Sequence, residues 1–99
     1  MYIYRTKWAK KDGILYKNPC VLTIGVEDDY PQFGRLESVF IADSNSVYFH
    51  VRLMKTLEFN VHRHLYLVDL TSSYKTVCFT HLYYPFPLHL SQHFNLFRY

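Results

Sequence analysis

The chain has 99 residues and a formal net charge of +3, with 49% hydrophobic and 19% aromatic residues. A chain of this length is expected to form one domain, residues 1–99, because domains rarely divide below roughly 150 residues, and its apolar content excludes intrinsic disorder. No run approaches the ~18 apolar residues of a membrane-spanning helix, and the modest net charge argues against a dedicated nucleic-acid clamp.

The first predicted elements form a hairpin. Residues 2–8 alternate aromatic with basic or aliphatic side chains, which predicts a strand with one buried aromatic face and one solvated basic face. Residues 10–13 predict a tight turn, because their Asp-Gly pair tolerates the positive φ that a hairpin turn requires. Residues 14–16 are the return strand, and Asn18-Pro19 ends it, since proline cannot donate to a strand ladder.

The middle of the chain holds the strongest strand signals. Residues 20–26 predict a strand rich in β-branched side chains, followed by an acidic loop at 27–32 that a Tyr-Pro pair closes. Residues 33–42 and 47–54 predict two long strands joined by a turn at 43–46. The second of these strands is the clearest in the chain, because every second side chain is apolar.

The next part is less regular. Residues 56–63 fit either a single helical turn or an irregular connection, because their alternation does not commit to one face. Residues 64–70 and 74–79 predict two strands around a turn at 71–73, where three hydroxyl residues follow one another.

The C-terminal residues complete the predicted fold. Pro85 and Pro87 exclude a regular central strand or helix between residues 84 and 88, residues 88–92 predict one helical turn, and residues 94–99 predict a closing strand. The whole pattern predicts an all-β fold, a small, partly open barrel of five to seven short antiparallel strands with at most one or two short helical turns. An immunoglobulin-like sandwich fits less well, because the one tryptophan precedes both cysteines.

Four segments in this order carry a family resemblance: Asp12-Gly13-Ile14-Leu15-Tyr16-Lys17, Tyr30-Pro31-Gln32-Phe33-Gly34-Arg35-Leu36, Val47-Tyr48-Phe49 and His64-Leu65-Tyr66. They resemble an uncharacterised module of animal proteins, notably fish proteins that look transposon-derived, where it accompanies zinc-finger or other DNA-binding segments. The resemblance covers most of the chain and implies a place in a larger, nuclear or transposon-derived protein. No activity is established for the family, so the resemblance assigns no functional residue.

More loosely, the layout is similar to Tudor, chromo-barrel and bromo-adjacent-homology barrels, in which aromatic side chains can cage a methylated lysine by cation–π attraction. This similarity makes Tyr30, Phe33, Tyr48 and Tyr66 candidates for an aromatic binding cluster, with an acidic residue among 27–29 as the counter-charge. The alternative is that the four rings belong to the core and its rim.

Basic residues near the N-terminus define a second candidate site. Arg5, Lys7, Lys10 and Lys11 interleave with aromatic residues, a mixture typical of proteins that bind single-stranded nucleic acid. Residues 1–17 carry five Lys or Arg against one Asp, whereas 27–43 carry five Asp or Glu against one Arg. The surface is therefore dipolar if these segments lie on opposite sides of the molecule.

The sequence contains no recognisable catalytic or metal-binding motif. Its three glycines form neither a phosphate loop nor a dinucleotide fingerprint, and no nucleophile elbow is present. Histidines and cysteines form loose pairs without the four convergent ligands of a structural zinc site: His62 with His64, Cys78 with His81 and His89 with His93. Cys20 and Cys78 are either two reduced thiols or one disulfide between strands. We expect no catalytic residue, no cofactor and no metal.

These observations predict a noncatalytic interaction module that contacts a protein partner or a second copy of itself, for example through exposed strand edges. Nucleic-acid binding through residues 2–11 is the alternative, and no membrane is expected among the partners. Residues 1–5 lack the apolar run of a secretory signal peptide. We therefore expect an intracellular protein, nuclear or cytoplasmic.

Overall fold

The structure, a computed structural model, describes residues 3–42, 46–62, 65–88 and 96–98. It confirms the predicted all-β fold, since these residues form antiparallel strands and one turn of 3₁₀ helix, in a sheet that does not close on itself. No helix among them is long and apolar enough to cross a membrane. The elements are β1 Ile3–Thr6, β2 Trp8–Lys11, β3 Ile14–Lys17, β4 Val21–Glu27, β5 Tyr30–Ala42, β6 Val47–Asn60, β7 Leu65–Cys78, η1 Phe79–His81, β8 Tyr84–Leu88 and β9 Leu96–Arg98.

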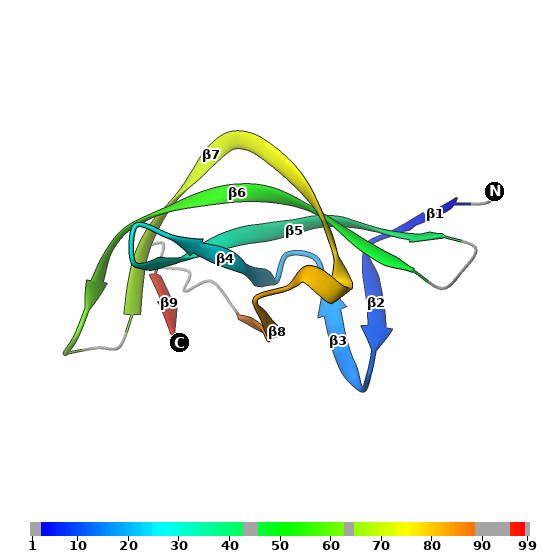
Figure 1. The fold of residues 1–99 in the computed structure, drawn as a ribbon, viewed down its shortest axis with the longest axis horizontal. Coiled ribbons are helices and arrows are strands. Elements are labelled where there is room, and N and C mark those ends of the chain that lie inside the picture. The colour runs from blue at the N-terminus through cyan, green and yellow to red at the C-terminus, as the bar shows by residue number, and fades with distance from the viewer. Residues whose placement is uncertain (1–2, 43–45, 63–64, 89–95, 99) are drawn as a thin grey trace.

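The main sheet has the strand order β8-β4-β5-β6-β7-β9 (Figure 1). One edge of β5 is shared by two strands, because its first part pairs with β4 and its last four residues, 39–42, pair with β1. The long strands β5, β6 and β7, of 13, 14 and 14 residues, form the body of the sheet and exceed the predicted lengths. Strands β2 and β3 form a separate hairpin.

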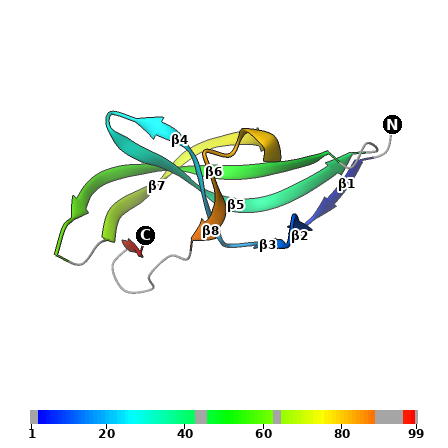
Figure 2. The ribbon, with the colours of Figure 1, turned by 60° about the horizontal axis from the view of Figure 1, so that its bottom comes forward.

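The β2–β3 hairpin covers one face of the main sheet and encloses the larger core. Ala9 and Tyr16 on its inner side are buried, and the Tyr16 ring packs 4.9 Å from that of Phe49 and 6.0 Å from that of Phe79. Figure 2 shows the hairpin and β8 on the same side of β5 and β6. The sheet residues of this core include Leu22, Ile24, Leu36, Val39, Val47, Val51 and Val77.

A second, smaller core holds Val21, Phe33, Met54 and Val68, with Tyr66 and Leu88 packed against it. Successive side chains of a strand point to opposite faces, so Val21 joins this cluster while its neighbour Leu22 joins the first. The first four residues of β4, 21–24, are therefore buried on both faces of the strand.

The N-terminal hairpin turn is confirmed, and the strand before it is corrected. Asp12 and Gly13 have φ of 52° and 80°, the left-handed conformation of a two-residue hairpin turn. The single strand predicted at 2–8 is wrong, because the chain bends at Lys7 and continues as β2. The backbone N–H of Asn18 donates to the Lys7 carbonyl over 2.9 Å and holds the bend.

The predicted buried aromatic face of this segment is also wrong. Tyr4 is 66% exposed and Trp8 is 55% exposed. Strand β1 reaches only the end of β5, and the hairpin turns Ala9 rather than Trp8 toward the core.

The predicted acidic loop at 27–32 is a two-residue turn. Asp28 and Asp29 have φ of 51° and 67° and connect β4 directly to β5, whose pairing starts at Glu27 and Tyr30. Aspartate tolerates this left-handed conformation better than most residues. Pro31 fits in the strand because it precedes the ladder between β5 and β6, which begins at Phe33.

Two further irregularities lie within long strands rather than between short ones. The segment predicted as a helical turn or connection at 56–63 continues β6 to Asn60, with Leu57 as an extra residue in the ladder. The turn predicted at 71–73 is an outward bulge of β7, where three residues face only Leu53. The Thr71 hydroxyl donates to the Leu53 carbonyl over 2.8 Å and accepts from the Ser73 N–H over 3.1 Å. A β-bulge thus replaces the predicted turn.

The prediction that Pro85 and Pro87 exclude a regular central strand or helix between residues 84 and 88 is confirmed, because the strand that forms there is an edge strand. Residues 84–88 form β8, which pairs with β4 at the first position of the sheet order. Proline is tolerated in an edge strand because its missing N–H can face away from the ladder. The closing strand is confirmed as β9, whereas the helical turn at 88–92 and the turn at 43–46 fall mostly outside the described residues.

Candidate functional site

The four predicted aromatic residues do not surround one ligand site. Phe33 is fully buried in the smaller core, and its ring lies 5.4 Å from that of Tyr66. Tyr30 lines a cleft at the turn between β4 and β5. Tyr48 lines a separate apolar hollow near the other end of β5. The structure therefore brings together only Phe33 and Tyr66, in a core contact.

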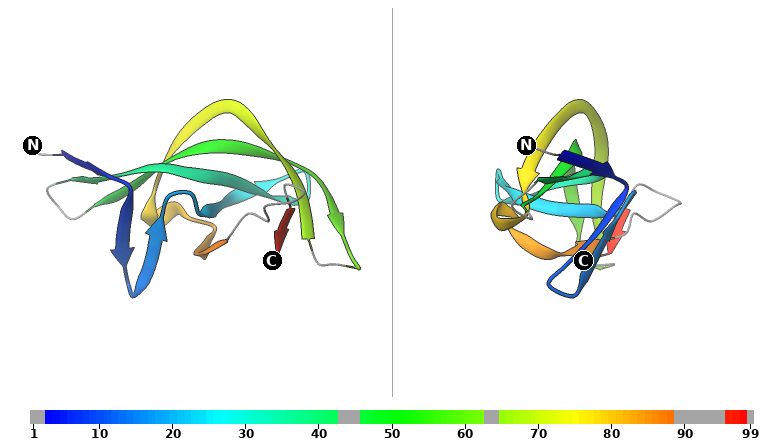
Figure 3. Two further views of the ribbon diagram at one scale, coloured as in Figure 1. Left: turned by 180° about the vertical axis from the view of Figure 1, so that it is seen from behind. Right: turned by 90° about the vertical axis from the view of Figure 1, so that its right-hand side faces the viewer.

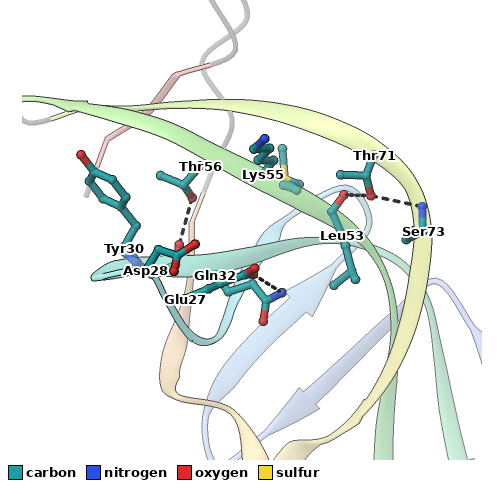
Figure 4. A pocket seen from close by; sticks show the side chains of 11 residues that line it. Glu27, Asp28, Tyr30, Gln32, Leu53, Lys55, Thr56, Thr71 and Ser73 are labelled. Atoms are coloured by element: carbon teal, nitrogen blue, oxygen red, sulfur yellow. Dashed lines mark hydrogen bonds between the residues drawn. The ribbon is translucent and has the colours of Figure 1, made fainter.

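The cleft beside Tyr30 has a volume of about 270 Å³ and combines acidic, basic and hydroxyl side chains. Figure 4 shows Tyr30 and Thr56 at one end and the bulge of β7 at the other. The Thr56 hydroxyl donates to the carbonyl of Pro31 over 2.9 Å, and the Gln32 amide donates to the Glu27 carboxylate over 3.2 Å. These polar groups bond to each other, and the residues that line the cleft come from four strands, β4, β5, β6 and β7, so the cleft is a structural junction.

The four predicted basic residues are spread over different surfaces. Arg5 lies on β1, exposed, and Lys7 lies at the bend before β2. Lys10 is exposed on β2, but Lys11 is half-buried and its Nζ lies 5.8 Å from the centre of the Phe79 ring. The four basic side chains therefore do not share one surface.

The outer face of the β2–β3 hairpin presents a surface that the sequence pattern did not reveal. Trp8 pairs with Lys17 and Lys10 pairs with Leu15, so these four side chains share one face. Their neighbours Ala9 and Tyr16 point into the core, which turns the four outward. Trp8 and Leu15 are 55% and 51% exposed. We call Trp8, Lys10, Leu15 and Lys17 the hairpin face.

The acidic turn lies far from the hairpin face. The molecule extends 47 Å along its longest axis, and Figures 1 and 3 show the β2–β3 hairpin toward one end and the turn between β4 and β5 toward the other. Glu27, Asp28 and Asp29 are exposed there beside the exposed apolar side chain of Val26. We call these four residues the acidic end. The condition for the predicted charge dipole, that residues 1–17 and 27–43 lie on opposite sides, is met only in part: the acidic turn lies away from the hairpin, but residues 39–42 pair with β1.

A third surface lies on the face of the sheet that the hairpin does not cover. Val39, Phe49 and Val77 point into the core, so the alternate residues point the other way. The Phe40 ring lies 6.4 Å from the His50 ring, which stacks on Tyr74 with centroids 5.3 Å apart and planes within 5°. An apolar hollow of about 420 Å³ adjoins them. We call this surface, made of Ile3, Arg5, Phe40, Tyr48, His50 and Tyr74, the aromatic face.

Both cysteines are free thiols. Cys20 is buried, and burial raises its pKa to about 11. Cys78 is only half-buried, and hydrogen bonds from the Thr80 hydroxyl and backbone lower its pKa. Within the described part of the chain, no three His, Cys, Asp or Glu residues converge as metal ligands would. His64, His89 and His93 lie outside that part.

Comparisons with protein-family models, curated proteins and solved structures found no match for this chain. The resemblances to the transposon-associated module and to Tudor-like barrels therefore stay predictions.

Proposed function

We propose that this chain is a noncatalytic protein-interaction module and that it binds its partner through the hairpin face. The observation that carries this proposal is the exposure of Trp8 and Leu15, which are diagonal neighbours on one face of the hairpin, each paired across it with a lysine. Exposed aromatic and aliphatic side chains rimmed by charge are typical of interaction surfaces. The tight packing of Ala9 and Tyr16 beneath them supplies a rigid support.

The partner that fits this face has an apolar centre and acidic surroundings, because complementary charge steers association and fixes its register. The acidic end of the same chain has this chemistry, with exposed Val26 beside three carboxylates. We therefore propose a second copy as the partner, with the hairpin face of one copy on the acidic end of the next. Such a contact joins two different patches and is heterologous.

On the ground of the family resemblance, we also propose that the module is part of a larger nuclear or transposon-derived protein. This protein would lie in the nucleus or the cytoplasm. The alternative of nucleic-acid binding through residues 2–11 has less support, because Lys11 lies next to the Phe79 ring on the side of the hairpin opposite to Lys10, and Arg5 lies on β1.

Sedimentation velocity tests the proposal. At low salt, the sedimentation coefficient should rise with concentration between about 10 µM and about 1 mM, the range of weak, transient contacts. In about 1 M salt the rise should disappear, because the Debye length falls to about 3 Å. At low salt, the double substitution Trp8→Ala and Leu15→Ala should abolish the rise of the sedimentation coefficient with concentration. The double substitution Lys10→Glu and Lys17→Glu should also abolish this rise, although it removes no apolar side chain.

The matched control is Tyr74→Ala, an exposed aromatic residue on the other side of the sheet. This variant should associate like the wild-type protein. A wild-type protein that stays monomeric throughout the range would contradict the proposal, and so would an equal loss of association in the control.

A further inference from the structure

We infer that the aromatic face binds single-stranded nucleic acid. This inference is independent of the proposed function, because it concerns the opposite side of the sheet and shares no residue with the hairpin face. It also differs from the sequence-based alternative, since of the four basic residues at 5–11 it retains only Arg5.

The ring arrangement supports this ligand. Strand pairing places Arg5 beside Phe40 and Phe40 beside Tyr48, in one row across β1, β5 and β6. The stacked rings of His50 and Tyr74 continue the surface onto β7. Tyr74 is 53% exposed and Ile3 is exposed beside the apolar hollow. Flat rings presented on neighbouring strands form a platform on which unpaired bases stack, and every base offers a suitable face.

The charges on this side of the sheet favour a polyanion. Arg5 is exposed, and Arg35 and Arg52 are half-buried neighbours on the same face. Glu37 pairs with Arg35 at 3.1 Å. The other described acidic residues lie in or beside hairpin turns, or in the halves of β6 and β7 beyond the bulge: Asp12, Glu27, Asp28, Asp29, Glu58 and Asp69. Guanidinium groups beside aromatic rings suit a ligand that alternates phosphates with bases.

A single strand fits better than a duplex or an acidic peptide. Bases in a duplex are stacked on each other and do not expose their faces to a sheet, whereas unpaired bases do. An acidic peptide would use the arginines but offers no flat bases to stack on the exposed surfaces of Tyr74 and Tyr48.

Fluorescence anisotropy with labelled 12-mers of thymidine and uridine tests the inference. Both oligonucleotides should bind at low salt, with affinity falling steeply as salt rises. Tyr74→Ala should weaken binding about tenfold to hundredfold through loss of one stacking contact. Tyr74→Phe keeps the ring and should bind like the wild-type protein, which also serves if the alanine variant folds poorly. Arg5→Ala should weaken binding to both oligonucleotides and reduce the salt dependence.

Trp8→Ala and the pair Lys10→Ala with Lys11→Ala are the controls, because these residues belong to the hairpin. They should leave oligonucleotide affinity close to that of the wild-type protein. Lack of binding at low salt would overturn the inference. So would loss of binding in the lysine pair while Arg5→Ala and Tyr74→Ala bind like the wild-type protein, or equal affinity for a poly-glutamate peptide of matched charge.

Discussion

The hydroxyl of Tyr16 donates a 2.6 Å hydrogen bond to the carbonyl of Pro85, joining the β2–β3 hairpin to β8 across 69 positions of sequence. The Tyr16 ring is fully buried against Phe49. One side chain thus links the hairpin, the core of the sheet and the edge strand, and it holds the hairpin face in a fixed orientation.

Removal of this hydrogen bond should destabilise the fold modestly. We expect Tyr16→Phe to lower the free energy of unfolding by about 1 kcal/mol, because the ring packing remains while the Pro85 carbonyl loses its donor. Tyr16→Ala should cost about 3 to 5 kcal/mol through the cavity it leaves. Urea denaturation measures both. Equal effects of the two substitutions would show that packing of the ring does not contribute.

Gly34 sits where no side chain fits. A Cβ at this position would lie 2.7 Å and 2.8 Å from Cγ2 and Cβ of Val51 on the paired strand. We expect Gly34→Ala to destabilise the protein by about 1 to 3 kcal/mol through overpacking. Gly25→Ala is the control, because its Cβ would meet only the Gln32 amide oxygen at 3.7 Å. In a double-mutant cycle, Val51→Ala should reduce the cost of Gly34→Ala; strict additivity would contradict the contact.

The two thiols should differ sharply in reactivity. The Cys78 sulfur lies 3.3 Å from the Thr80 hydroxyl, and this contact lowers its pKa, whereas burial raises the pKa of Cys20 to about 11. Only the thiolate attacks iodoacetamide, so mass spectrometry should show one modified cysteine in the folded protein and two after unfolding. Thr80→Val should slow modification of Cys78. Comparable rates at both cysteines in the folded protein would contradict the burial of Cys20.

Stability should fall at alkaline pH. The pKa of Cys20 is about 11 in the folded protein against an ordinary value of 9.0. The unfolded protein therefore loses the thiol proton at a lower pH than the folded protein does. Its stabilising contribution is fully present below pH 9 and is lost as the pH rises through 11. A shift of this size corresponds to about 2 to 3 kcal/mol, and burial raises the pKa of Tyr16 in the same sense.

Thermal melting from pH 8 to pH 11 checks this expectation. The melting temperature should decline most steeply above pH 9, and Cys20→Ala should show a shallower decline relative to its own value at pH 8. An unchanged slope in this variant would contradict the role of Cys20.

The local sequence pattern was enough to predict the strands and the Asp12-Gly13 turn. The strand lengths and the bulge in β7 depend on long-range pairing between strands. The Asp12-Gly13 turn depends on residues that tolerate positive φ, and these are visible in the sequence. The bulge at Thr71 depends instead on a hydrogen bond to Leu53, 18 residues away. Three consecutive hydroxyl residues are therefore ambiguous between a turn and a bulge until the partner strand is known.

The surfaces show the same limit. Alternation correctly places Trp8 and Ala9 on opposite faces, yet only the position of the hairpin against the sheet decides that Ala9 is buried and Trp8 exposed. The aromatic face combines residues of four strands. Its rings are conspicuous in the composition, but their stacking follows from strand register, which one sequence does not reveal.

Mixing two complementary variants tests the central claim most directly, since a head-to-tail contact needs one intact hairpin face and one intact acidic end. The first variant combines Lys10→Glu with Lys17→Glu. The second combines Asp28→Asn with Asp29→Asn, which removes charge while keeping a residue that tolerates the positive φ of the turn. By sedimentation velocity at low salt, each variant alone should be monomeric and their mixture should form a 1:1 dimer. A mixture that remains monomeric, or variants that each associate like the wild-type protein, would contradict the head-to-tail contact.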